Sequence, residues 1–222
     1  MAARLFLDAE PWVDWAWVST HVPTMLADLE QHVTLTAIAL AGGLIIALPL
    51  GVAAYRWTAL RAPALGVFGA FYTIPSLALF ALLVPYTGIS GVTAEIALIG
   101  YTVLILLRNV IVGLDAVPKD VLEAADGMGY RPLARLLQVE LPLALPAILA
   151  GVRIATVSTI GIVTIAVVIG LGGLGELIYQ GLIESFHTPL VVGLVLCVAL
   201  ALVADLSLAL AQRLVIPWAR AA

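Results

Sequence analysis

The residues of this sequence that could do chemistry are charged side chains inside long apolar runs, above all Arg153 and Asp205. An ionisable group within a membrane span is costly unless it has a partner or faces water. Arg153 lies 11 residues after Pro142, and Asp205 lies 9 residues before Leu214. At about 1.5 Å per helical residue the two charges reach similar depths, roughly 16 and 13 Å from the same side. We predict an ion pair between them, which serves either as a structural clamp or as part of a transport pathway.

No other residues are spaced for catalysis or metal binding. The histidines are scattered, without a partner at i,i+4 or a nearby cysteine, so solvated or interfacial positions are expected for His21, His32 and His187. No base is spaced to activate a serine or threonine. The glycine run 170–175 lacks the preceding strand of a phosphate-binding fingerprint and predicts a tight turn. The chain is therefore expected to be no enzyme and to hold no metal.

The composition predicts an integral membrane protein. Of the 222 residues, 63% are hydrophobic and 11% are charged, whereas soluble domains are about a quarter charged. A helix needs about 20 apolar residues to cross about 30 Å of hydrocarbon. Residues 1–32, rich in tryptophan, are predicted to lie at the outer interface, and residues 215–222 to form a tail. We predict an all-α membrane protein whose five transmembrane helices are 33–55, 65–85, 94–114, 143–169 and 190–214.

Basic residues predict how these spans are oriented. The loop after the first span, the polar stretch 118–142 and the tail share one side of the membrane. That side holds Arg56, Arg61, Lys119, Arg131, Arg135, Arg213 and Arg220, and the other side has only Arg4. Because cytoplasmic loops carry the excess of lysine and arginine, the polar stretch and the C-terminus are predicted to be cytoplasmic and the N-terminus outside.

A bent helix within the second span is the first candidate for a transport path. Pro75 removes a backbone donor and is expected to kink the helix close to Phe71 and Tyr72. Aromatic rings at such a place either pack between helices or offer a cation–π surface to an alkylammonium solute. The candidate path residues are Phe71, Tyr72, Pro75, Ser76, Tyr101 and Asn109.

The polar stretch 118–142 is too charged to lie in lipid and is expected at the membrane surface. Two short helices are predicted, one at 119–126 and one beginning at Pro132, separated by glycines. Leu141 and Pro142 are then expected to redirect the chain into the fourth span. We therefore predict that this polar hairpin inserts into a partner protein.

The spacing within this stretch is specific. It reads Glu-Ala-Ala at 123–125, three residues, Gly129, nine residues, Val139, one residue, then Leu-Pro at 141–142. This resembles the EAA loop of permease subunits of binding-protein-dependent ABC importers, where isoleucine is usual in place of Val139. In that family the loop forms a coupling helix that docks into a cleft on the ATP-binding subunit. The resemblance implies coupling roles for Glu123, Ala124, Ala125, Gly127, Gly129, Leu141 and Pro142.

The likeness extends to the osmoprotectant branch of these permeases, which serves glycine betaine, carnitine, choline or proline. It is carried by the segments 32–35, 49–51, 72–78, 107–109, 139–146 and 169–175. The resemblance implies the core fold of a type I ABC importer permease with five spans, located in the bacterial plasma membrane. It also implies import of a compatible solute, above all a quaternary ammonium compound such as glycine betaine.

The resemblance further implies the partners. These are two ATP-binding subunits that hold the ATP and magnesium, a second permease that is identical or homologous, a separate extracytoplasmic solute-binding protein and the lipid bilayer, with no nucleic acid. This chain contains no nucleotide loop, so no cofactor is expected in it. Two alternatives stay open: a permease of the same architecture for amino acids such as methionine, and a passive, osmotically gated channel.

Overall fold

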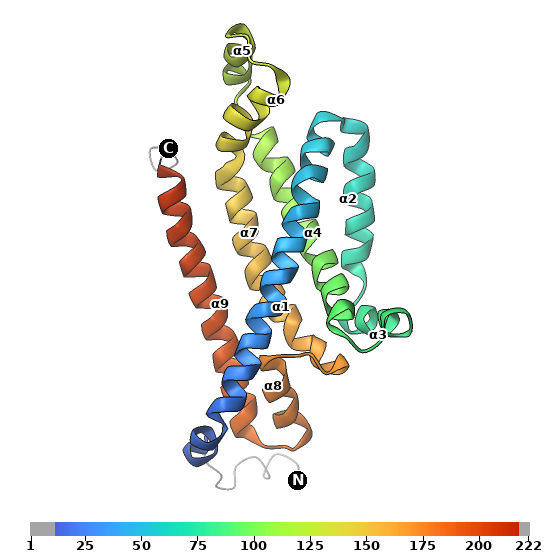
Figure 1. Ribbon diagram of the computed structural model, residues 1–222, viewed down its shortest axis with the longest axis vertical. Coiled ribbons are helices and arrows are strands. Elements are labelled where there is room, and N and C mark those ends of the chain that lie inside the picture. The colour runs from blue at the N-terminus through green and yellow to red at the C-terminus, as the bar shows by residue number, and fades with distance from the viewer. Residues whose placement is uncertain (1–11, 218–222) are drawn as a thin grey trace, which may run out of the picture.

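The structure, a computed structural model, describes residues 12–217, and every regular element within that range is helical (Figure 1). A π-helical turn, Leu136–Glu140, and a 3-10 segment, Thr164–Ile169, precede and follow α7. The helices are α1 (Trp15–Arg56), α2 (Thr58–Thr73), α3 (Ser76–Thr87), α4 (Gly91–Asp115), α5 (Lys119–Gly127), α6 (Pro132–Arg135), α7 (Leu141–Val163), α8 (Leu174–Ile183) and α9 (His187–Val215).

Four helical stretches are long and apolar enough to cross a membrane, namely α1, α4, the stretch Pro132–Ile169 and α9. The pair of α2 and α3 is a fifth if the two are counted as one broken span. The 42 residues of α1 extend about 63 Å, twice the hydrocarbon thickness. This helix continues through residue 32, where the end of the interfacial segment was predicted. The all-α prediction is confirmed, and the count of five spans and their orientation stay predictions.

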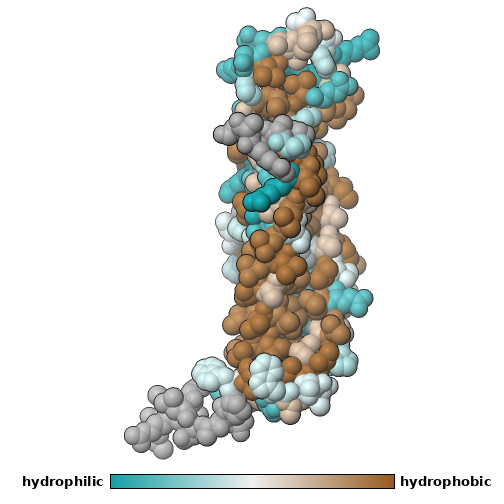
Figure 2. All heavy atoms as spheres, turned by 90° about the vertical axis from the view of Figure 1, so that its left-hand side faces the viewer, coloured by the Kyte–Doolittle hydropathy of each residue, from teal (hydrophilic) through white to brown (hydrophobic). Residues whose placement is uncertain are grey.

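The two ends of the molecule carry different elements (Figure 1). The C-terminal end of α1 lies toward the upper end in that view, together with the hairpin of α5 and α6; we call it the hairpin end. The start of α1 lies at the opposite end, near α8, and α3 lies beside the lower end of α4. Figure 2 shows hydrophilic residues gathered at the hairpin end, above a broad apolar surface suited to lipid.

The crossing of α1 and α4 forms the centre of the bundle. Gly43, Ala47 and Gly51 follow one another at four-residue intervals on α1, and all are buried. A Cβ added to Gly43 would lie 2.7 Å from Cγ2 of Thr102, and one added to Gly51 would lie 2.5 Å from Cγ1 of Val110. Small residues at these positions therefore let the two helix backbones approach closely, which is how helices associate when lipid offers no hydrophobic driving force.

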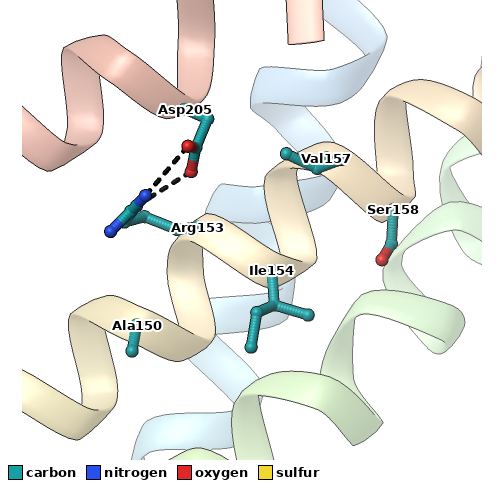
Figure 3. Close-up of a pocket in the computed structure, with 6 residues that line it drawn as sticks. All are labelled: Ala150, Arg153, Ile154, Val157, Ser158 and Asp205. Carbon is teal, nitrogen blue, oxygen red and sulfur yellow. Dashed lines mark hydrogen bonds and ion pairs between the residues drawn. The ribbon is translucent and has the colours of Figure 1, made fainter. Parts of the chain in front are cut away.

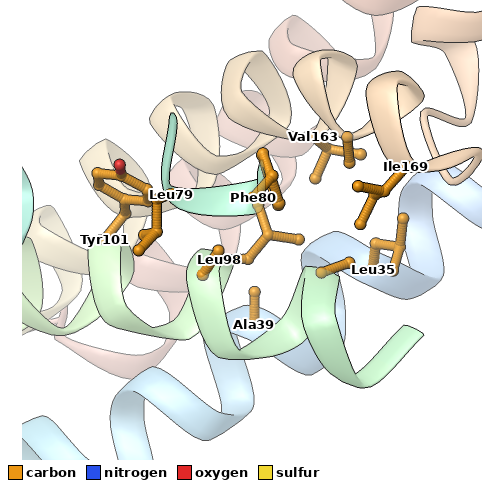
Figure 4. Close-up of a cluster of buried hydrophobic side chains, with 11 residues drawn as sticks. Leu35, Ala39, Leu79, Phe80, Leu98, Tyr101, Val163 and Ile169 are labelled. Carbon is orange, nitrogen blue, oxygen red and sulfur yellow. The ribbon is translucent and has the colours of Figure 1, made fainter. Parts of the chain in front are cut away.

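A buried apolar cluster joins α3 to the bundle (Figure 4). Phe80 of α3 is fully buried and lies between side chains of α1, α4 and the 3-10 segment. The face of α3 that carries Phe80 is therefore covered by protein. The cluster includes Leu35, Ala39, Leu79, Phe80, Leu98, Tyr101, Val163 and Ile169.

The predicted second span, 65–85, is broken at Pro75, where a kink was expected, and a single crossing by its two parts stays a prediction. A bend of 96° separates α2 from α3 within it. Pro75 has no N–H and disfavours helical backbone in the residue before it, so Ile74 adopts an extended conformation with φ −67° and ψ 127°. The Ile74 carbonyl accepts a hydrogen bond from the Tyr101 hydroxyl at 2.5 Å, which holds the break against α4.

The predicted change of direction at Leu141 and Pro142 is wrong. The chain is helical without interruption over Pro132–Ile169. Within it, Leu136–Glu140 forms a π-helical turn in which the Leu141 N–H donates to the carbonyl of Leu136, five residues earlier. Pro142 then falls in the first turn of α7, where a proline is tolerated because its missing N–H would have no helical partner.

We expect Tyr101→Phe to lower the stability of the folded protein by about 1 kcal/mol, because it keeps the ring and removes the hydrogen bond to Ile74. Thermal unfolding in detergent measures this loss as a lower Tm. Tyr86→Phe is the control, because Tyr86 is 83% exposed. Equal Tm values for the two variants would show that the bond at the break contributes nothing.

Candidate coupling loop and intramembrane ion pair

The hairpin is closed by a capping motif that requires Gly129. The Gly129 N–H donates to the Asp126 carbonyl at 3.0 Å, and the Tyr130 N–H donates to the Ala125 carbonyl at 3.1 Å. These two bonds form a Schellman motif, in which the residue after the C-cap takes a left-handed backbone. Gly129 has φ +81°, which glycine adopts without steric cost. Gly127 remains helical, so the predicted break of this helix falls at Gly129 alone.

The outer surface of the hairpin is exposed and partly apolar. Glu123 and Ala124 face solvent, whereas Ala125 is buried. Exposed apolar side chains at a polar, membrane-external hairpin indicate a contact with another protein. Those of the hairpin are Met128, Leu133 and Leu137.

The carboxylate of Glu140 joins the hairpin to the spans. Glu140 is 0% exposed, and its Oε1 accepts from Nη2 of Arg56 and from Nε of Arg135, each at 2.9 Å. Arg135 also donates to Asp126 of α5 at 2.6 Å, and Arg56 donates to the Pro132 carbonyl at 3.2 Å. The end of α1, the hairpin and the start of α7 are thus held by one set of charge-assisted bonds.

Sequence reasoning missed this role of Glu140. It treated Arg56 and Arg135 only as charges that set orientation. The available signal was an acidic residue directly before Leu141, at the entry to an apolar span and close to several arginines. Leu141 itself is half-buried, against a cluster of α4 and α7 side chains, and Pro142 is half-buried beside it.

Arg153 of α7 and Asp205 of α9 form the ion pair predicted from their depths (Figure 3). Arg153 Nε donates to Oδ1 of Asp205 and Nη2 donates to Oδ2, both at 2.8 Å, in a bidentate arrangement. The pair lies at a groove on α7. Another ion pair, between Arg61 of α2 and Asp115 of α4, lies at the hairpin end and is exposed.

The candidate path residues do not form one surface. Phe71, Tyr72 and Tyr101 gather at the break between α2 and α3, with ring centroids 5.8 Å apart for Phe71 and Tyr101 and 5.6 Å apart for Tyr72 and Tyr101. Pro75 and Ser76 lie at the same break, before and at the start of α3. Asn109 is eight residues beyond Tyr101 on α4, about 12 Å along the helix, and lies against Gly151 of α7.

His32 corrects the expectation of solvated or interfacial histidines. It is fully buried, its Nδ1 accepts from the Leu174 N–H at 3.3 Å, and its Nε2 therefore carries the proton and donates to the Ile160 carbonyl at 3.0 Å. His32 thus joins α1 to α7 and α8. The glycine run is the predicted tight turn, with φ +71° at Gly170 and +50° at Gly173. Residues 12–217 contain no group of three or more His, Cys, Asp or Glu side chains that could hold a metal ion.

This fold and loop define a transport permease, and comparison with known proteins agrees. Residues 23–220 match the family described as binding-protein-dependent transport system inner membrane component, so the chain belongs to that family. It is a multi-pass protein of the bacterial plasma membrane, related to transport permeases rather than to enzymes. Membership implies ATP-binding and substrate-binding partner proteins.

Among its relatives, the chain is 38% identical over 203 residues to the choline transport system permease protein OpuBB of Bacillus subtilis, covering 90% of this chain and 93% of that one. It is 41% identical over 180 residues to the osmoprotectant import permease protein OsmW of Salmonella typhimurium, covering 79% and 84%. The predicted resemblance to osmoprotectant permeases is confirmed. A solved structure of the MetNI methionine ABC transporter, facing inward, shares the fold with a TM-score of 0.78 at 24% identity, covering 88% of this chain and 98% of that one.

We expect Gly129→Val to open the hairpin locally, because a β-branched residue is strained in left-handed backbone, at a cost of about 1–2 kcal/mol. Hydrogen exchange of the Tyr130 amide, measured by mass spectrometry, is expected to become about 5- to 30-fold faster. Gly129→Asn is the matched variant, because asparagine tolerates this conformation, and its effect is expected to be smaller. Equal exchange rates in the two variants would contradict the capping role.

We expect Glu140→Gln to lower the stability by about 2 kcal/mol, because it weakens charge-assisted bonds to two guanidinium groups. Thermal unfolding in detergent measures the change. Glu184→Gln is the control, because Glu184 is exposed. The double variant with Arg135→Gln is expected to lose less than the sum of the single variants, and strict additivity would show that the two side chains do not interact.

Proposed function

We propose that this chain is the membrane permease of an ATP-driven importer for compatible solutes, above all glycine betaine or a related quaternary ammonium compound. The observation that carries the proposal is the match to a choline transport permease, with 38% identity over 93% of that permease's length. A second relative is described as an osmoprotectant import permease. The exposed EAA-type hairpin supports coupling to a partner that supplies energy.

ATP hydrolysis belongs to the partners in this proposal. Two ATP-binding subunits hold the ATP and magnesium and receive the hairpin, which faces the cytoplasm together with the C-terminus. A second permease, identical or homologous, completes the passage, because five spans do not easily enclose a two-sided path. A separate binding protein delivers the solute from outside.

The hairpin transmits the motion of the ATP-binding subunits to the spans. Glu123, Ala124 and Gly127 are exposed on it and are the proposed contacts, whereas Ala125, Gly129, Leu141 and Pro142 maintain its shape. Arg135 bonds both Asp126 and Glu140, so a displacement of α5 moves the start of α7 with it. Closure of the ATP-binding subunits then shifts the permeases from inward-open to outward-open.

Contacts between solute and aromatic residues remain part of the proposal. Tyr72 is the exposed member of the aromatic group, and its ring is free to face a cation. Phe71 and Tyr101 support it through edge contacts. Pro75 and Ser76 shape the helices around this position, whereas Asn109, further along α4 and against Gly151 of α7, is a separate proposed path residue.

The alternative of an amino-acid permease rests on the fold. The MetNI structure has a TM-score of 0.78 but 24% identity, which is a likeness of fold alone. The relatives at 38% and 41% identity favour a compatible solute. A passive channel would not require the hairpin at all.

The proposal is tested by ATP hydrolysis in proteoliposomes that contain the permease, its ATP-binding subunits and its binding protein. We expect glycine betaine or choline to raise the rate, with methionine leaving the basal rate unchanged, because solute-loaded binding protein drives the cycle. Stimulation by methionine alone would favour the amino-acid permease.

Glu123→Lys separates the importer from the passive channel. Reversal of an exposed charge on α5 is expected to weaken binding of the ATP-binding subunit by about tenfold or more, measured by copurification, and to lower solute accumulation. Asp14→Asn is the control for copurification, because Asp14 caps the start of α1, at the end of the molecule opposite the hairpin. Unchanged accumulation with Glu123→Lys would favour the channel.

A further inference from the structure

The Arg153–Asp205 pair differs from the Glu140 network in its exposure. Glu140 is 0% exposed between its two arginines. The side chains of Arg153 and Asp205 are 33% and 32% exposed, although both lie in helical stretches that are apolar enough to cross a membrane. A charge pair in that position must face water, a ligand or another protein surface, because lipid solvates it poorly.

The pair also retains unused hydrogen-bonding capacity. Arginine has five N–H donors, and each carboxylate oxygen accepts more than one hydrogen bond. Arg153 uses two of its donors, both toward Asp205. Within residues 12–217 neither side chain has another hydrogen-bond partner. Donors and acceptors of opposite charge are therefore available side by side.

These groups open into a groove large enough for a small solute (Figure 3). Its volume is about 530 Å³, within the range of roughly 300–1,000 Å³ typical of small-molecule sites. The rest of the lining comes from α7 and is apolar except for one hydroxyl: Ala150, Ile154, Val157 and Ser158. Figure 3 shows Arg153 reaching across to Asp205 of α9 while Ile154 and Ser158 extend from a neighbouring face of α7.

We propose that this groove is a solute-binding subsite of the permease for a zwitterionic small molecule. The solute carboxylate binds the free guanidinium donors of Arg153, the ammonium group lies toward Asp205, and methyl groups pack against Ile154 and Val157. The pair and a zwitterion are both neutral overall, so binding adds no net charge within the membrane. A lone cation or anion brings an uncompensated charge and is disfavoured. The solute class rests on the proposed function.

Thermal unfolding of the purified permease with its ATP-binding subunits, without binding protein, tests the subsite, because a ligand that binds the folded state raises the Tm. Glycine betaine is the zwitterionic probe and choline the cationic one. We expect glycine betaine to raise the Tm more than choline does, and Arg153→Gln to abolish that preference. Arg61→Gln, which removes the exposed pair with Asp115, is the matched control. It is expected to keep the larger rise in Tm with glycine betaine.

An exchange variant, Arg153→Asp with Asp205→Arg, separates binding from a purely structural role. It retains an ion pair between α7 and α9 but reverses its direction in the groove. We expect it to recover the ligand-free Tm and to lose the glycine betaine effect. An exchange variant that recovers both the ligand-free Tm and the rise in Tm with glycine betaine would overturn the proposal. A larger rise in Tm with glycine betaine than with choline in Arg153→Gln would overturn it too.

Absence of any glycine betaine effect in the unaltered complex would also overturn the subsite. That outcome leaves the proposed function standing, because the measurement requires neither the binding protein nor ATP hydrolysis. If the exchange variant does not fold, the Arg153→Gln result decides alone.

Discussion

An unpaired charge is costly in an apolar environment, and this constraint accounts for how the chain places Glu140 and Arg153. The Glu140 carboxylate is buried where the hairpin meets the spans, and it receives a guanidinium group from Arg56, 84 residues earlier. Arg153, inside a span, receives a carboxylate from 52 residues further along. In each case a charge is tolerated because a distant element supplies its opposite, so each pair also specifies which helices lie together.

The two sets of charges differ in the exposure of their central groups. The Glu140 carboxylate is enclosed, and its bonds and those of Arg135 connect α5, α1 and α7. The Arg153–Asp205 pair keeps donors and acceptors free in a groove. In the proposed function, the first set carries motion to the spans and the second binds solute.

Local rules predicted much of this arrangement. The apolar runs predicted α1, α4, α7 and α9, the spacing of the EAA-type stretch predicted the hairpin, and helical rise predicted the Arg153–Asp205 pair. The same rules were less accurate at two prolines. The kink expected at Pro75 is a bend as large as 96°, and at Pro142, where a change of direction was predicted, the helix continues from a π-helical turn.

The sequence by itself determined the membrane class, the family and the closing glycine of the hairpin. These follow from hydropathy, spacing and backbone preference, which are properties of neighbouring residues. Only the tertiary structure decided that His32 is buried, that Tyr101 supports the break at Ile74, that Glu140 is enclosed and that the intramembrane pair is open. Those features depend on which helices lie side by side, and apart from the matched depths of Arg153 and Asp205 the local patterns did not indicate which side chains meet across the bundle.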